Sequence, residues 1–250
     1  MHDQVLRAEY IFSLVAINGF RMKGRRLLWH QGFSRTRILP KKVQRIELYG
    51  RVSAYFARQR FQLMQSLPDA RAALVIAHPG HELRVHGWLE IARPLVFVLT
   101  DGSGWSGLSR LNSTTKVLSG AGAKIGPIFG RFTDKQIYAS ILETDISRIT
   151  GLATELADSF LQNGVEYVAG DASEGYNPTH DLCRLVLNAA VELIKSRTSS
   201  HLGNFDFPLT GRPDDGHHKL LKRAIRLDLD DIAFKRKVRI AQSYTELLRR

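Results

Sequence analysis

The chain of 250 residues has a single cysteine, Cys183, and therefore cannot form an internal disulfide. It also has no apolar run approaching the roughly 18 to 20 residues that span a bilayer. The apolar stretch 10–17 is short, has only Arg7 ahead of it, and meets the basic stretch 21–26 without a small-residue cleavage site. We therefore expect no signal peptide, and we expect the protein to work in the cytoplasm.

Acidic residues are scarce only near the beginning of the chain. Residues 1–71 carry 14 Lys and Arg against 4 Asp and Glu, whereas the remaining residues carry 22 against 20. This asymmetry divides the chain into a basic, partly helical extension over 1–70 and a domain over 71–250. The extension is either simply solvated or a surface, over 1–66, that contacts anionic lipid at the inner membrane face. Nucleic acid is the weakest partner, because no recognition motif accompanies the charge.

From residue 71 onward, short apolar runs alternate with segments of helical spacing. The runs are typical of strands buried on both faces and cover residues 72–77, 95–99, 124–129 and 165–169. The helical segments cover residues 83–92, 108–120, 137–162 and 181–195, with further ones at 44–66 and 227–250. This alternation predicts an α/β fold, a Rossmann-like parallel sheet flanked by helices. In such a sheet, ligands bind beyond the carboxyl ends of the strands.

The first buried run ends in a pair of histidines, in the sequence His78-Pro79-Gly80-His81-Glu82. The strand delivers His78 to its carboxyl end, and the Pro-Gly turn lets His81 face the same point. Two imidazoles at this spacing suit a borderline metal such as zinc. Taken alone, a pair like this is more often two turn histidines than a metal site.

A second polar cluster, residues 171–181, follows the fourth run and places His180 at the start of the next helix. A third imidazole there would complete a three-ligand site with an open position for water, the arrangement of catalytic zinc. The alternative is a helix-start signal, with Thr179 or Asp181 as the capping residue. Capping and metal binding can coexist.

With these elements in this order, residues 71–250 resemble the PIG-L (LmbE-like) N-acetylglucosaminyl deacetylase family. The resemblance lies in an A-H-P-x-x-E motif, a strand ending in T-D-G, and a late H-P-x-H-like box; here these are residues 77–82, 100–102 and 177–180. It implies an LmbE-like fold and an enzyme that uses zinc, or another borderline divalent metal, to deacetylate an N-acylated sugar. The sugar would be a small molecule or linked to a lipid or nucleotide, in surface-polysaccharide synthesis.

The chain departs from the family pattern at three positions. The family's A-H-P-D-D-E motif has its general base where this chain has Gly80, and an aspartate ligand where it has His81. The implied metal ligands are therefore His78, His81 and His180. Asn177 stands where the family has a histidine that stabilises the developing oxyanion.

A hydrolase with glycine at the base position needs another carboxylate to handle protons. The candidates are Glu174, Asp181 and Glu82; we rank Glu174 first, because Gly175 lets its loop fold over the site, and expect Glu82 to make supporting contacts. For substrate binding we select Asp101, Arg110 and Asn177. The alternatives to a sugar deacetylase are an impaired member that binds a sugar or partner without hydrolysis, and a hydrolase of a different acyl group.

Overall fold

The structure, a computed structural model, describes residues 8–13, 70–104, 106–198, 201–211 and 224–244. All of these belong to one compact unit formed by residues 1–15 and 67–250. The helix predicted over 44–66 lies outside the described residues. So does the proposed lipid-contacting surface over 1–66, apart from residues 8–13.

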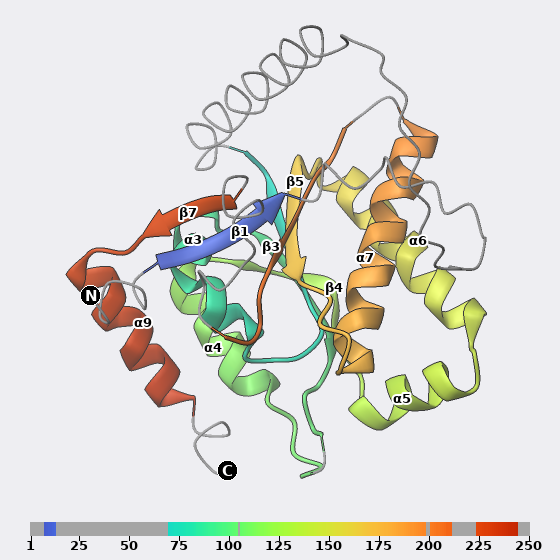
Figure 1. Cartoon of the computed structure of the whole chain (residues 1–250), viewed down its shortest axis with the longest axis horizontal. Helices are drawn as coiled ribbons and strands as arrows, with labels where there is room; N and C mark the ends of the chain where they lie inside the picture. The colour runs from blue at the N-terminus through green and yellow to red at the C-terminus, as the bar shows by residue number, and fades with distance from the viewer. Residues whose placement is uncertain (1–7, 14–69, 105, 199–200, 212–223, 245–250) are drawn as a thin grey trace, which may run out of the picture. The chain divides into compact units, whose positions relative to one another are not determined.

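The described residues form a seven-stranded mixed sheet around which the unit is built (Figure 1). In spatial order its strands are β4 (Lys124–Phe132), β3 (Leu95–Thr100), β2 (Ala72–Ile76), β5 (Tyr167–Asp171), β6 (Gly203–Phe207), β1 (Ala8–Ser13) and β7 (Ala224–Asp228). The first five strands are parallel, and β1 is antiparallel to both β6 and β7. The prediction of a parallel α/β sheet flanked by helices is confirmed at this level.

The strand β1 corrects one part of the sequence analysis, which assigned its residues to the basic extension. Its core, Tyr10, Ile11 and Phe12, consists of aromatic and β-branched residues that favour a pleated, half-buried surface. Its partners β6 and β7 come from the far end of the chain, so no local pattern announces the pairing. The sheet therefore includes a strand from the basic extension, a segment whose charge suggested a separate role.

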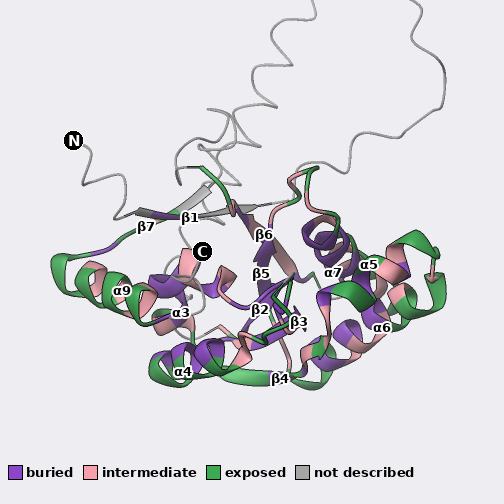
Figure 2. Cartoon of the chain, turned by 90° about the horizontal axis from the view of Figure 1, so that it is seen from below, coloured by how far each residue is buried: buried purple, intermediate pink, exposed green. Residues whose placement is uncertain are grey.

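Helices cover both faces of the sheet, and Figure 2 shows them in two groups. One group consists of α5 (Asp134–Leu142), α6 (Ile146–Gln162) and α7 (Pro178–Arg197), and the other of α3 (His86–Ala92), α4 (Leu111–Ala121) and α9 (Asp231–Ser243). The 3-10 helix η1 (His81–Val85) leads into α3. Strand side chains such as Ala73, Val75 and Phe97 pack with α6 and α7 in the main apolar core.

The helix starts follow the local sequence. Thr133 caps α5 in a reciprocal capping box with Gln136, and the side chain of Asp145 caps α6. The prediction of a single helix over 137–162 is therefore wrong. The segment forms the two helices α5 and α6, which are separated at Thr144, a residue with φ 54°. No helix among the described residues is both long enough and apolar enough to cross a membrane.

Candidate metal centre

Three histidines meet at the carboxyl ends of β2 and β5. His78 follows β2, His81 begins η1, and His180 lies in the first turn of α7, which follows β5. Their ring centres are 5.3 Å (His78–His81), 4.9 Å (His78–His180) and 4.8 Å (His81–His180) apart. A tetrahedral zinc ion with Zn–N distances near 2.0 Å would place three imidazole centres about 5 Å apart. The structure thus brings the three residues predicted as ligands together, with ring centres at distances compatible with one ion.

Each of the three imidazoles has a carboxylate beside its Nδ1 atom. The distance is 3.0 Å from His78 to Asp134 Oδ1, 2.9 Å from His81 to Asp171 Oδ2, and 2.8 Å from His180 to Glu174 Oε2. At His81 and His180 the carboxylate accepts a hydrogen from Nδ1 and so fixes the tautomer whose lone pair is on Nε2. Histidines that bind metals are commonly oriented in this way. Among the described residues, Asp134 Oδ1 has no hydrogen bond of good geometry and faces His78 as a charge.

The Nδ1 atom of His78 lies beside a hydroxyl group as well as beside the carboxylate of Asp134. Thr100 Oγ1 lies 2.7 Å from His78 Nδ1 and donates to the carbonyl oxygen of Ala77 at 3.1 Å. The other oxygen of Asp134 accepts a hydrogen bond from the backbone N–H of Gly104. His78 is thus held by the ends of β2 and β3 and by the first residue of α5.

The electrostatics of this cluster favour a bound cation. Burial would raise the pKa of Asp134, but the close contact and charge of His78 outweigh it and lower that pKa to about 2. Burial also opposes ionisation of Asp171, yet the charge of His81 and its hydrogen bond leave the pKa of Asp171 below its usual value. The pKa of His78 is lowered, chiefly by burial. The carboxylates beside the histidines thus place negative charge in the site, which a cation would neutralise.

Two arginines support the carboxylates from behind. The buried Arg184 donates from Nε to the carbonyl oxygen of Asp171 at 2.6 Å, and its Nη atoms bind Asn204 and Phe205 on β6. Arg84 donates to the carbonyl oxygens of Pro208 and Gly211 at 3.1 and 3.0 Å. Its charge also interacts with Glu174. Arg184 thus fixes the backbone from which Asp171 projects, and Arg84 joins η1 to the loop after β6.

The side-chain atoms that would bind a metal do not converge on one point. Within the described ranges, no group of three or more His, Cys, Asp or Glu side chains is arranged to hold an ion. One departure is visible at His180, whose Nε2 lies 3.0 Å from Asn177 Nδ2. The same Asn177 caps α7, because its Oδ1 accepts the N–H of Thr179 at 3.0 Å. The residues fit a borderline metal by donor chemistry and ring spacing, with an amide at one ligand atom.

The three carboxylates predicted to handle protons have other contacts. Glu174 lies behind His180 and also accepts from Thr210 Oγ1 at 3.2 Å. Asp181 accepts from Ser173 Oγ at 2.6 Å and from the N–H of Glu174 at 2.8 Å, and the bond from Ser173 chiefly lowers its pKa. Glu82 is completely buried. These contacts orient histidines and loops.

The contacts of Glu82 show how the first motif is held. Its carboxylate accepts the N–H of Gly80 at 2.7 Å and the hydroxyl of Thr114 at 2.8 Å, and burial raises its pKa. Thr114 in turn lies 2.7 Å from the hydroxyl of Tyr244, just beyond α9. A buried chain of hydrogen bonds therefore links the C-terminal helix to the turn between the first two histidines.

Asp101 and Arg110, predicted to bind substrate, lie on the loop after β3. Asp101 Oδ1 accepts the N–H of Ser103 at 2.9 Å, and Arg110 Nε donates to the carbonyl oxygen of Gly102 at 2.7 Å. A Cβ atom at Gly102 would lie only 2.8 Å from Pro79 Cδ. The loop and Arg110 therefore pack directly against the first histidine motif.

Four residues that contact the histidines or their partners were not predicted from the sequence: Asp134, Asp171, Thr100 and Arg184. The sequence did carry a signal for Asp171, because this residue ends a buried strand and begins the polar cluster that contains His180. The sequence carried no such signal for Asp134, because a helix start explains this residue fully.

Comparison with protein-family models, curated proteins and solved structures gave no match for this chain.

Proposed function

We propose that this chain is a hydrolase that uses zinc, or another borderline divalent metal, to cleave an N-acyl amide on an amino sugar. The observation that carries the proposal is the triangle of His78, His81 and His180, with a carboxylate beside each Nδ1 atom. Sugar as the substrate class is supported by the resemblance to the PIG-L deacetylase family. That the sugar is linked to a lipid or a nucleotide is also part of the proposal.

The contacts within the site suggest a role for each residue. The three imidazoles would bind the metal through Nε2, while Asp134, Asp171 and Glu174 hold the rings from behind. Such an ion polarises a carbonyl group and lowers the pKa of a water molecule to about 7. Asn177 lies at the edge of the triangle, and its amide N–H can donate to an oxygen that gains negative charge.

A second candidate function follows from the base position. Gly80 has no side chain, and Glu174, Asp181 and Glu82 are all engaged in the contacts described above. A positioned base contributes about 10²- to 10⁴-fold to such a reaction. The same centre therefore suits a slow hydrolase or a protein that binds an N-acyl sugar without cleaving it.

Metal content of the full-length protein, prepared without a polyhistidine tag, tests the proposal. After reconstitution with zinc, we expect close to one ion per chain in the wild type, loss of the ion in His78→Ala, and retention in His201→Ala. His201 is an exposed histidine that precedes β6 and serves as the matched control. An unloaded wild type, or loss of zinc in both variants, would refute the metal centre.

Hydrolysis is then measured as amine release from N-acetylglucosamine and other N-acyl amino sugars. Release by the zinc-loaded wild type, absent in His78→Ala, supports the hydrolase. Stoichiometric zinc and sugar binding without amine release across the panel supports the binding protein instead.

A further inference from the structure

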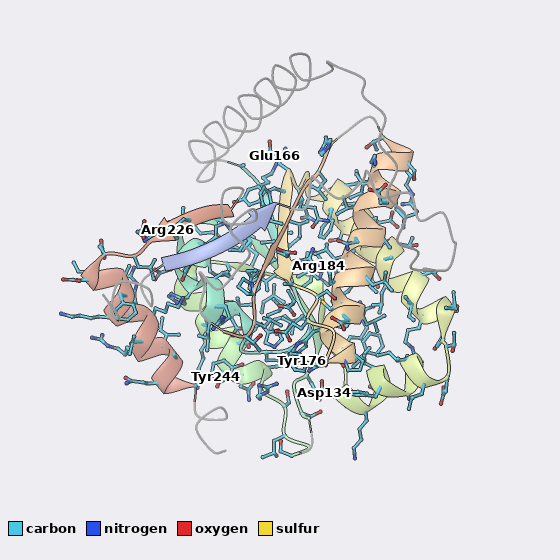
Figure 3. The ribbon with its side chains drawn as sticks, in the orientation of Figure 1. Asp134, Glu166, Tyr176, Arg184, Arg226 and Tyr244 are labelled. Carbon is cyan, nitrogen blue, oxygen red and sulfur yellow. The ribbon has the colours of Figure 1, made fainter. Side chains whose placement is uncertain are left out.

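An exposed tyrosine stands beside the candidate metal centre. Tyr176 is 64% exposed, and its ring centre lies 6.3 Å from that of His180 at an interplanar angle of 72°. In Figure 3, Tyr176 and Asp134 both lie beyond the arrowhead of β5, at the end of the sheet where the histidines meet. An exposed aromatic ring beside a cluster of polar groups offers a flat apolar surface on which a ligand can pack.

The loop that carries this ring is fixed by hydrogen bonds. Asp181 accepts from Ser173 Oγ at 2.6 Å, from the N–H of Glu174 at 2.8 Å and from the N–H of Gly175 at 3.1 Å. The neighbouring carboxylate of Glu174 raises the pKa of the Tyr176 phenol. Because the hydrogen bonds to Asp181 fix the backbone immediately before Tyr176, less loop entropy is lost when a ligand covers the ring.

We propose that Tyr176 is the platform on which the sugar ring of the substrate stacks, an inference that rests on the proposed function. A pyranose has an apolar face of C–H groups, and the face of an aromatic ring carries the negative potential that attracts them. The exposed Thr210, whose hydroxyl donates to Glu174, offers an acceptor for a hydroxyl group of the sugar.

The dimensions agree with a single sugar unit. In a 2-acylamino pyranose, the acyl carbon lies about 4 Å from the ring centre, by summing ordinary bond lengths. A sugar stacked on Tyr176 can therefore bring its acyl group toward His180, whose ring centre is 6.3 Å from that of the tyrosine. An acyclic amide has no face to stack and gains nothing from the platform.

Saturation-transfer NMR with N-acetylglucosamine and the zinc-loaded, full-length protein tests this assignment. The variants are Tyr176→Ala, Tyr176→Phe and, as a control, Tyr138→Ala, which removes another exposed tyrosine from α5. We expect Tyr176→Ala to weaken sugar binding about 2- to 12-fold and to abolish saturation of the sugar ring protons while the acetyl methyl signal persists. Tyr176→Phe keeps the ring and should bind as the wild type does, as should Tyr138→Ala.

The inference is overturned if Tyr176→Ala binds the sugar unchanged, if Tyr176→Phe loses as much as Tyr176→Ala, or if the wild type gives no ring-proton saturation. Amine release from N-acetylethanolamine separates these failures from failure of the proposed function. An enzyme that cleaves this acyclic amide equally well with tyrosine or alanine at 176 remains a hydrolase whether or not the platform exists.

Discussion

Replacing Asn177 by serine should make the protein bind zinc more tightly. The side-chain amide of Asn177 does two things at once: Oδ1 caps α7, and Nδ2 donates to the Nε2 atom that His180 would offer to a metal. Serine is about as good a helix cap as asparagine, but it is too short to bring a donor to His180 in the same way. Asn177→Ser therefore removes the competitor and leaves the helix start intact.

The size of the effect follows from the bond that zinc must displace. A neutral intramolecular hydrogen bond contributes about 0.5 to 1.5 kcal/mol net. Its removal from the metal-free state should increase zinc affinity by about 2- to 12-fold, since each 1.4 kcal/mol is a factor of ten. Asn177→Ala also removes the cap, and we expect it to cost about 0.5 to 2 kcal/mol of unfolding free energy.

Competition for zinc against a chromophoric chelator gives the affinities, and chemical denaturation of the metal-free proteins gives the stabilities. We expect Asn177→Ser to show tighter zinc binding with unchanged stability, and Asn177→Ala to show reduced stability. If Asn177→Ser binds zinc equally or more weakly, the amide is not a competitor for His180, and the geometry at this ligand has been misinterpreted.

Three further predictions concern the support of the fold and the site. Asp171→Asn should lower zinc affinity about 10- to 100-fold in the same competition assay, because the carboxylate that orients His81 is lost. Burial raises the pKa of Tyr167 to about 12, so the stability linked to this phenol is complete below pH 10 and falls as the pH rises toward 12. Denaturation curves of Tyr167→Phe should lack this alkaline decline. At pH 7 this variant should be at least as stable as the wild type, because the buried Tyr167 hydroxyl lies beside Trp88 without a hydrogen bond of good geometry in the described part of the chain. Tyr244→Phe should cost about 0.5 to 1.5 kcal/mol in urea denaturation, because the Thr114 contact is lost, whereas a change below this range would show that the buried chain contributes little.

The parallel core of the sheet was predictable because its signal is local. Every residue of β2 is buried, so the strand reads as a continuous apolar run, and the same holds for most of β3. The strands β6 and β7 carry no such run: Asn204 and Asp206 interrupt the first, and Arg226 and Asp228 the second. Their pairing with β1 depends on contacts between distant parts of the chain, which periodicity does not encode.

The histidines of the candidate centre were predictable for a related reason. A residue that directly follows a buried parallel strand lies at the carboxyl edge of the sheet, and the strands β2 and β5 are adjacent there. Their carboxylate partners depend on tertiary structure. The pair His81 and Asp171 is separated by 90 residues, and Asp134 reaches His78 only because its helix starts beside the end of β3.

The case of Glu174 shows where spacing ceases to determine a role. The sequence places it next to Gly175, in a loop able to fold over the site, and that placement suggested a base. In the structure Gly175 has φ 76°, and the loop does turn back, but Asp181 binds its backbone at Glu174 and Gly175. The carboxylate of Glu174 is thereby directed to His180 Nδ1, with its side chain only 7% exposed. A carboxylate in that position orients the ring of His180, and the same loop carries Tyr176. The role of base that the sequence suggests for Glu174 stays a prediction.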